Sequence, residues 1–419
     1  MKNTATRRSF FSWTRNALAA AGAVRATPGL AAGETAAAAG EDYYAKLGVT
    51  KIINAAGTYT ALTSSIMPPS VQAAVAGAAH HPVRLAELQR KAGEYIAQRL
   101  KCEAALVSAG AASALTLGTA ACMTVGNPQT VTLLPQDVSG LKNEVIIQKD
   151  HRYPYDHAIS NCGIRFVEVE TLDQYDKAFT PKTVMCHFFN AAESGQISRE
   201  QWVAVAHRHG VPCFNDAAAD VPPISNLWNY TKMGFDLVTF SGGKGIRGPQ
   251  NAGLLLGRKD LIEAAGWSNS PHDNTVGRGM KVAKEQIVGM VAAIDWILGQ
   301  SDESLEAEFR RRANLIAAHL KDIPTLRQEV FVPAAANAVP HLVIRYDQTR
   351  VKIKPLDVAQ VLREGTPAIE LNPSTGRKPV SAGLPGGEDT ILVGVWMLQP
   401  GEDLIVARRL REVLLKASA

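Results

Sequence analysis

One lysine on a glycine-rich turn between two apolar segments constrains the fold more than any other part of the chain. Lys244 lies in the run SGGKGIRG, residues 241–248. The apolar segments 237–240 and 252–256 on either side predict two buried strands, and the glycines allow the backbone to turn sharply between them. Lys244 is therefore expected at the end of a strand, which is where α/β folds bind their ligands.

Three motifs of other protein classes overlap this turn. Its glycines match the dinucleotide pattern G-x-G-x-x-G, but a strand follows where the helix that holds a pyrophosphate should begin. Ser241 and Lys244 match the S-x-x-K of serine acyl-enzymes, although the companion motifs S-D-N and K-T-G are absent from the sequence. A Walker A loop would need glycine in place of Val238. The serine acyl-enzyme is therefore kept as an alternative.

The charge of the chain is balanced outside its first residues. The sequence has 44 basic and 39 acidic residues, and the five basic residues before Glu34 account for the whole excess. A neutral body without a basic arm gives little electrostatic attraction to a phosphate backbone. No nucleic-acid partner is predicted.

The N-terminus is typical of a twin-arginine export signal. Arg7 and Arg8 precede two phenylalanines and a short apolar run, Ala17 to Val24. This run is far shorter than the ~20 residues that a membrane helix needs, so no stable membrane anchor is expected. We expect the twin-arginine machinery to export the folded protein to the periplasm.

The cysteines and histidines form no recognisable ligand pattern. Five cysteines are scattered without C-x-x-C spacing, which is typical of buried thiols. No metal site is predicted from them or from the ten histidines.

Apolar segments alternate with helical patterns along most of the chain, which favours an α/β fold. Short strands separated by helices are typical of a mostly parallel sheet that helices cover on both faces. The predicted strands are 104–107, 144–148, 165–169, 183–188, 211–215, 237–240 and 252–256. The predicted division is an export signal and linker at 1–41, a large domain at 42–275, and a connecting helix (about 276–300) with a smaller α+β domain at 276–419.

Several residues suit an enzyme that uses pyridoxal 5′-phosphate (PLP). Such an enzyme needs a lysine that forms a Schiff base, a carboxylate at the pyridine nitrogen, donors for the phosphate and a planar group over the ring. Lys244 is the candidate lysine. Asp216 is the candidate carboxylate, since an ionised acid keeps the ring nitrogen protonated. Asp220 competes for this role, and the strand-end position favours Asp216.

Small residues after the strand 104–107 open a helical run and suggest a phosphate site. A strand, a small-residue turn and a helix N-terminus bind anions through backbone N–H groups. The same small residues would also suit tight helix packing. The residues expected to bind the cofactor phosphate are Ser108, Gly110, Ala111 and Ala112, with Ser241 and Arg247 as further donors.

The segment HRYPYDH, residues 151–157, follows the strand 144–148 and could supply the stacking group. His151 is the first candidate and His157 the second, although lone histidines more commonly have structural roles. Lys244, Asp216 and His151 are the predicted catalytic residues.

Six segments resemble one known group of PLP enzymes. They are LGVTKIINAAGTYTALTSSIMPPSV, EAALVSAGAASALTLGTAAC, HRYPYDHAI, FNDAAADVPP, TFSGGKGIRGPQNAGLLLGRKDLI and GRGMKVAKEQIVG. These segments resemble the selenocysteine-synthase-like enzymes of fold type I, above all the D-glucosaminate-6-phosphate ammonia-lyase branch. The resemblance implies an aminotransferase-like fold, with Lys244 as the Schiff-base lysine and Asp216 as the pyridine partner. It also implies a homodimer or higher oligomer with active sites between subunits.

The residues and the resemblance together predict a carbon–nitrogen lyase that acts on a 2-amino acid or amino-sugar acid by α,β-elimination. Lys244 is expected to remove the Cα proton, and Arg278 or Arg345 to bind the substrate carboxylate. Aldol cleavage, racemisation, transamination and selenium-transferase-like β-replacement begin from the same cofactor linkage and stay open. A catalytically silent periplasmic binding protein of the same fold also stays open.

Overall fold

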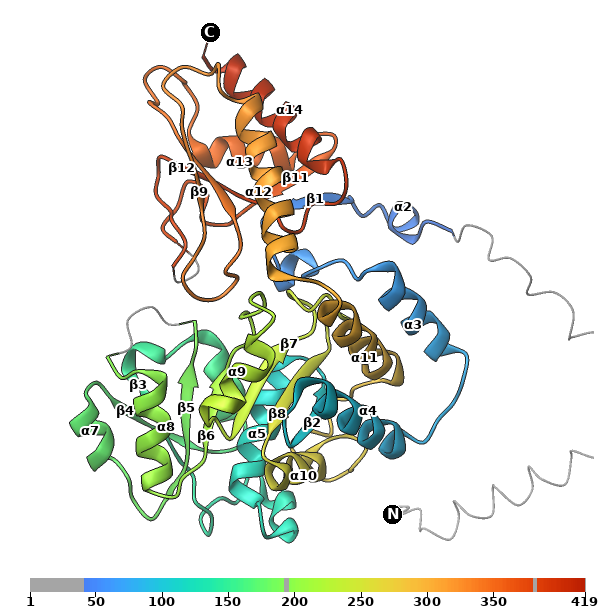
Figure 1. Ribbon diagram of the computed structural model, residues 1–419, viewed down its shortest axis with the longest axis vertical. Coiled ribbons are helices and arrows are strands. Elements are labelled where there is room, and N and C mark those ends of the chain that lie inside the picture. The colour runs from blue at the N-terminus through green and yellow to red at the C-terminus, as the bar shows by residue number, and fades with distance from the viewer. Residues whose placement is uncertain (1–40, 192–195, 380–382, 419) are drawn as a thin grey trace, which may run out of the picture. The chain divides into compact units, whose positions relative to one another are not determined.

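The computed structural model describes residues 41–191, 196–379 and 383–418 (Figure 1). The predicted export signal lies outside these ranges, except for residue 41. Of the described residues, 41–51 belong to a first unit, and those from Ile52 onwards belong to a second. In the first unit, the short helix α2 (Tyr43–Leu47) is capped by the Asp42 side chain and ends at Gly48.

The second unit contains a seven-stranded, mostly parallel sheet. Its strands are β2 (Ala104–Ser108), β3 (Glu144–Gln148), β4 (Arg165–Val169), β5 (Thr183–Phe189), β6 (Cys213–Asp216), β7 (Leu237–Ser241) and β8 (Gly253–Gly257). They lie in the order β2-β8-β7-β6-β5-β3-β4, and only β8 runs antiparallel to its neighbours, β7 and β2. The seven predicted strands and the mostly parallel sheet are confirmed.

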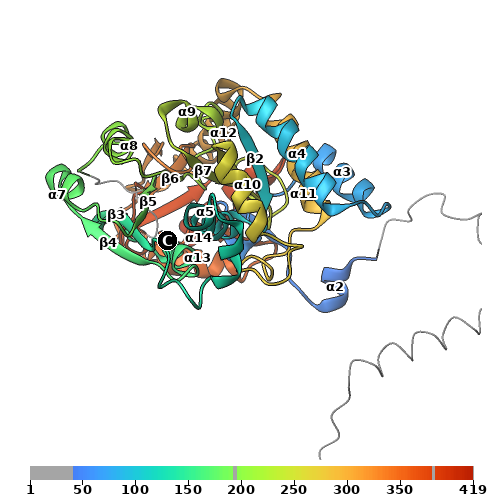
Figure 2. The same ribbon diagram turned by 90° about the horizontal axis from the view of Figure 1, so that it is seen from below.

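Helices cover both faces of this sheet. They are α3 (Pro69–Ala79), α4 (Leu85–Leu100), α5 (Ala111–Thr124), α6 (His157–Ser160), α7 (Leu172–Lys177), α8 (Arg199–Arg208), α9 (Asn226–Met233), α10 (Lys259–Ser268) and α11 (Lys284–Leu298). Alternate strand residues point to opposite faces. Ile146 and Cys186 pack with α4, α8, α9 and α11, whereas Val145 and Met185 pack with α5, α6 and α10. Figures 1 and 2 both show α3, α4 and α11 side by side near β2.

The C-terminal region has a smaller core of its own. Its elements are α12 (Asp302–His319), β9 (Arg327–Phe331), β10 (His341–Arg345), α13 (Pro355–Arg363), β11 (Ala368–Leu371), β12 (Thr390–Gly394) and α14 (Glu402–Lys416), joined by β1 (Ile52–Ala55). The antiparallel sheet β12-β10-β9 and the parallel pair β1-β11 share one apolar cluster with the three helices. A strand that precedes the large sheet in the chain therefore packs with the C-terminal region.

One predicted helix begins later than expected. α11 starts at Lys284 rather than near residue 276. The preceding loop is held by a bridge between Asn269 and Gly277, and a Cβ at Gly277 would lie 2.3 Å from the carbonyl oxygen of Ser268. This close backbone approach keeps the loop off a helical path.

Single helical turns connect several of these elements. They are η1 (Thr60–Leu62), η2 (Pro128–Leu133), η3 (Lys149–His151) and η4 (Pro154–Asp156). Across the described ranges, every helix is too short or too polar to cross a membrane.

Candidate active site

The carboxyl ends of β6 and β7 lie side by side, and the turn that carries Lys244 begins there. Asp216 is the last residue of β6 and pairs in register with Thr239 of β7. Lys244 follows three residues after β7 ends at Ser241. Because parallel strands bring their carboxyl ends to one edge, the structure places Lys244 and Asp216 in the same site.

The turn that carries Lys244 has no room for side chains at two of its glycines. A Cβ at Gly245 would lie 1.8 Å from the carbonyl oxygen of Val221. A Cβ at Gly243 would lie 2.6 Å from the Cα of Gln250. Only glycine tolerates such close backbone approach. These packed glycines therefore fix the backbone on both sides of Lys244.

The ammonium group of Lys244 is destabilised by its surroundings. Burial lowers the pKa of Lys244, and the charges of Asp216 and Asp220 only partly oppose this effect. Among the residues that the structure describes, no carboxylate lies within ion-pair distance of its Nζ. A neutral amine is both the nucleophile for a carbonyl group and a general base, so the site favours the reactive form.

Asp216 is a buried carboxylate that keeps strong hydrogen-bond donors. The Tyr153 hydroxyl donates to its Oδ2 at 2.5 Å, and the Ala218 N–H donates to its Oδ1 at 3.0 Å. Burial raises the pKa of Asp216, while these two donors and the charge of Lys244 act in the opposite direction. A cationic group placed beside Asp216 would stabilise its ionised form further.

Tyr153 is a site residue that the sequence analysis missed. Its ring stacks on Phe189 with centroids 3.8 Å apart, and its hydroxyl lies 3.3 Å from the Nε2 of His187 as well as bonding to Asp216. Burial and the Asp216 charge raise the pKa of Tyr153, which therefore stays a neutral donor. Nothing in the run HRYPYDH distinguishes this tyrosine from its neighbours, so no sequence signal could have selected it.

The two histidines predicted to stack on the cofactor differ in their surroundings. The Nδ1 of His151 accepts the Phe189 N–H at 3.1 Å, and its ring packs edge-on against Phe188 at 4.5 Å. Burial lowers the pKa of His151 to about 4. His157 begins α6 and is exposed. The structure brings Tyr153, and not His151 or His157, into contact with Asp216. The stacking role of the two histidines stays a prediction.

The N-terminus of α5 lies next to the end of β2 and offers unpaired donors. Gly110 caps the helix with a φ of 89°, and the Ser108 hydroxyl donates to its carbonyl oxygen at 2.9 Å. Ala111 and Ala112 form the first helical positions. The Oγ of Ser113 is buried without a hydrogen-bond partner among the described residues. Free backbone N–H groups at a helix N-terminus and a spare hydroxyl suit a phosphate group.

The Arg247 side chain contacts two tryptophans. Its Nη2 donates to the carbonyl oxygen of Trp396 at 2.6 Å, and its guanidinium lies 5.9 Å from the ring of Trp296. Burial lowers the pKa of Arg247 to about 10. Its left-handed backbone, with a φ of 56°, ends the lysine turn. The contacts give Arg247 a role in joining the turn to the C-terminal region, and none of them supports the predicted phosphate role.

The two arginines predicted to bind a substrate carboxylate each have an acidic partner. The Nε of Arg278 donates to Asp273 at 3.3 Å. The Nη1 of Arg345 donates to Glu329 at 3.1 Å within the small sheet. Neither pair includes a residue of the Lys244 turn, so the substrate role of Arg278 and Arg345 stays a prediction.

Asp220, the competing carboxylate, is bound in a separate network. Asn190 donates to its Oδ2, and the Tyr230 hydroxyl donates to the same oxygen at 3.2 Å. The Oδ1 has no hydrogen-bond partner among the described residues. Burial raises the pKa of Asp220 to about 6. These contacts occupy Asp220 and leave Asp216 as the carboxylate beside Tyr153.

The raised pKa of Asp220 predicts a pH-dependent stability. Its folded pKa of about 6 lies above the ordinary value of 3.8, so the folded state binds the proton more tightly than the unfolded state. This contribution is fully present below pH 4 and is lost as the pH rises to 6, at a cost of about 3 kcal/mol. Asp220→Asn should therefore gain about 2 kcal/mol in unfolding free energy relative to wild type between pH 4 and pH 7. Urea denaturation of both proteins at pH 4 and pH 7 measures this difference in unfolding free energy. A difference that does not vary with pH would contradict the prediction.

Comparisons with known proteins agree with this site. A model of aminotransferase class-V proteins matches residues 164–371. The D-glucosaminate-6-phosphate ammonia lyase of Salmonella typhimurium is 28% identical over 388 residues, which cover 88% of this chain and 97% of that protein. A 5′-C-glycyluridine monooxygenase-decarboxylase from a Streptomyces species is 28% identical over 342 residues, 78% of this chain and 83% of that protein.

The fold agrees as well. A solved structure of D-glucosaminate-6-phosphate ammonia-lyase superposes with a TM-score of 0.76 and 28% identity, over 90% of this chain and 99% of that one. The residues described above fit PLP: an amine at Lys244, a carboxylate at Asp216, and the α5 terminus with the spare Ser113 hydroxyl for the phosphate. The chain therefore has a region that matches the aminotransferase class-V model and the architecture of fold type I, and its cofactor is pyridoxal 5′-phosphate.

Proposed function

We propose that this enzyme catalyses α,β-elimination of a 2-amino acid or amino-sugar acid with a 3-hydroxyl group, and that it releases ammonia. The main support for this proposal is the site itself. Lys244, with a lowered pKa, lies at the same strand ends as the buried, hydrogen-bonded Asp216. The likeness to an ammonia lyase along 88% of the chain supports this choice of reaction.

The side chains supply the proton transfers of such a reaction. When bound, PLP would withdraw electrons from the Cα of the amino acid and make its proton acidic. Lys244, whose ammonium form is disfavoured by burial, is placed to accept this proton as general base. Asp216 would hold the positive charge of the pyridine nitrogen, and Tyr153 keeps the Asp216 carboxylate oriented. Loss of the 3-hydroxyl group as hydroxide leaves an enamine of the substrate. Hydrolysis of the released enamine gives a 2-oxo acid and ammonia.

A second reaction is supported by the likeness to a monooxygenase-decarboxylase, which is also 28% identical. Such a reaction would break the bond from Cα to the carboxylate rather than the bond from Cα to hydrogen. It would release carbon dioxide and consume oxygen. The two proposals therefore differ in every product that can be measured.

The test is a substrate screen with the purified holoenzyme. Serine, threonine and 2-amino-2-deoxy sugar acids, with and without a phosphate ester, are incubated with the enzyme. Ammonia, 2-oxo acid, carbon dioxide and oxygen are measured in parallel. Equal amounts of ammonia and 2-oxo acid, without carbon dioxide, are expected from a 3-hydroxy substrate. Carbon dioxide with oxygen uptake would favour the second reaction, and no product from any substrate would contradict both.

Two further properties belong to this proposal: export through the twin-arginine machinery to the periplasm, and a homodimer. The paired arginines, Arg7 and Arg8, support export, and the resemblance to fold type I enzymes supports the dimer. Cell fractionation of a strain that carries Arg7→Lys and Arg8→Lys, and sedimentation equilibrium of the purified protein, test them. A periplasmic variant or a monomer would contradict the respective property.

A further inference from the structure

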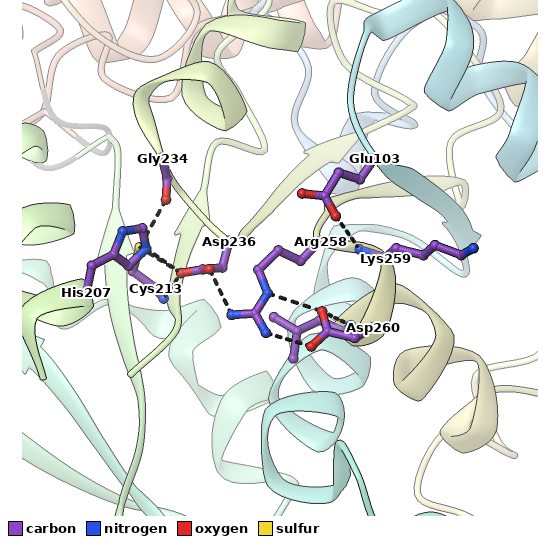
Figure 3. Close-up of polar contacts among 9 residues, drawn as sticks. Glu103, His207, Cys213, Gly234, Asp236, Arg258, Lys259 and Asp260 are labelled. Carbon is purple, nitrogen blue, oxygen red and sulfur yellow. Dashed lines mark hydrogen bonds and ion pairs between the residues drawn. The ribbon is translucent and has the colours of Figure 1, made fainter. Parts of the chain in front are cut away.

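A second cluster of chemically reactive side chains lies at the amino ends of β6 and β7. The Lys244 site lies at the opposite, carboxyl ends of the same strands. His207 is in the last turn of α8, Cys213 begins β6, and Asp236 directly precedes β7 (Figure 3). Asp216 ends the same strand that Cys213 begins, three residues later, which corresponds to roughly 10 Å along a strand. The cluster is therefore separate from the Lys244 site.

The three side chains converge on one oxygen atom. The Nε2 of His207 lies 2.9 Å from the Oδ2 of Asp236, and the Sγ of Cys213 lies 3.3 Å from the same oxygen. The Sγ and the Nε2 are 3.8 Å apart. In a tetrahedral zinc site, bond lengths of about 2.0–2.3 Å place neighbouring ligand atoms roughly 3.3–3.6 Å apart. The two separations from the sulfur are close to edges of such a tetrahedron, and the hydrogen-bonded Nε2 and Oδ2 would move slightly apart to bind one ion.

The hydrogen bonds in the cluster occupy the positions that a metal ion would take. Asp236 Oδ2 accepts from the Cys213 thiol, from the Cys213 backbone N–H at 2.8 Å and from the His207 ring. A metal ion would replace the thiol proton and the ring proton. The thiol proton would leave to solvent, and the neutral ring would carry its proton on Nδ1 instead. The Cys213 N–H bond would remain and orient the carboxylate.

The same geometry excludes a catalytic cysteine. In a Cys-His-Asp relay the thiol and the carboxylate contact different ring nitrogens. Here the Cys213 Sγ and the Asp236 Oδ2 both face the Nε2 of His207. Cys213 is also fully buried, so a substrate has no access to its sulfur. The arrangement is suited to holding an ion and not to nucleophilic attack.

Neighbouring residues support the candidate ligands. Arg258 donates to the other oxygen of Asp236, Oδ1, at 3.1 Å and is itself paired with Asp260 (Figure 3). Such outer contacts orient metal-binding carboxylates in known sites. Gly234 has a φ of 113°, and a Cβ at this position would lie 3.7 Å from the Cε1 of His207. The His207 side chain is 45% exposed, which leaves solvent access for a fourth ligand.

We propose that His207, Cys213 and Asp236 bind one divalent transition-metal ion, with Zn²⁺ as the best match. Imidazole and thiolate ligands select Zn²⁺ over Mg²⁺ and Ca²⁺, which prefer oxygen. Three protein ligands with an open position correspond to a zinc ion that also binds water. The ion would tie the C-terminus of α8 to the amino ends of β6 and β7.

The test is zinc binding to the full-length holoenzyme. The protein is dialysed against Zn²⁺ with free cofactor removed, and bound metal is measured by elemental mass spectrometry. We expect one Zn²⁺ per chain in wild type and at least ~100-fold weaker binding in His207→Asn, because even the outer partners of metal ligands contribute ~10–100-fold. His209→Asn is the matched control, since His209 lies two residues away and pairs with Asp176. Its zinc affinity should equal that of wild type.

A second measurement separates ligand loss from misfolding. Co²⁺ in place of Zn²⁺ should give a thiolate-to-metal absorption band in the near ultraviolet. Cys213→Ser should remove this band, and Cys186→Ser should keep it, because Cys186 is the buried register partner of Cys213 on β5 but contacts neither other ligand. Equal zinc binding by wild type and His207→Asn, or an unchanged band in Cys213→Ser, would overturn the proposal.

Discussion

Lys244→Ala should lose the covalent retention of PLP and almost all turnover. The turn holds this lysine at the carboxyl edge of the sheet, and burial keeps part of its amine neutral. Loss of a general base alone lowers the turnover rate by about 10²–10⁴-fold. Loss of the covalent bond between Lys244 and the cofactor lowers the rate further. We therefore expect activity to fall by at least about 10³-fold.

Borohydride reduction followed by peptide mass spectrometry measures the linkage directly. In wild type the reduced cofactor should be found on the peptide that contains Lys244, together with a visible absorption band before reduction. The matched control is Lys259→Ala, because Lys259 is exposed at the start of α10. Cofactor fixed to another lysine in wild type, or retained covalently by Lys244→Ala, would show that the assignment is wrong.

Asp216→Asn should have the second-largest effect, about 10²–10³-fold on kcat, which is the usual consequence of removing one fixed electrostatic partner from a reaction centre. The asparagine oxygen can still accept the Ala218 N–H, but the negative charge beside the pyridine nitrogen is lost. The fold should persist, because the substitution keeps the shape of a buried side chain. Steady-state kinetics with a substrate from the screen and circular dichroism test these two expectations.

The control for Asp216 is Asp220→Asn, a buried carboxylate four residues later. Asp220 is bound by Asn190 and Tyr230 and makes no contact with Tyr153. The loss of kcat should therefore be larger for Asp216→Asn than for Asp220→Asn. The reverse order would identify Asp220 as the cofactor carboxylate.

The strands of the large sheet and the place of Lys244 could be predicted from sequence because their signals are local. Central strands of a parallel sheet are buried on both faces, so they appear as largely apolar runs such as 145–147 and 237–240. The glycines around Lys244 likewise mark a turn whose backbone contacts exclude side chains. These residues and the resemblance together predicted the cofactor, which the comparisons confirm.

The weaker elements carried no such signal. β1 and β11 are four residues each and pair across more than 300 residues of chain. Short, partly exposed strands have no distinctive pattern, and their stability comes from a partner that the local sequence does not specify. The late start of α11 also depends on a distant backbone contact, at Gly277.

By itself, the sequence determined the order of the strands and helices of the large domain and the lysine turn between β7 and β8, because both follow from local hydrophobicity and backbone freedom. Only the tertiary structure decided which side chains face each site. Tyr153 rather than His151 reaches Asp216, Arg247 turns to Trp396, and His207, Cys213 and Asp236 meet at the far edge. Side-chain direction depends on rotamers and on the register of neighbouring strands, and these are fixed only when the core packs.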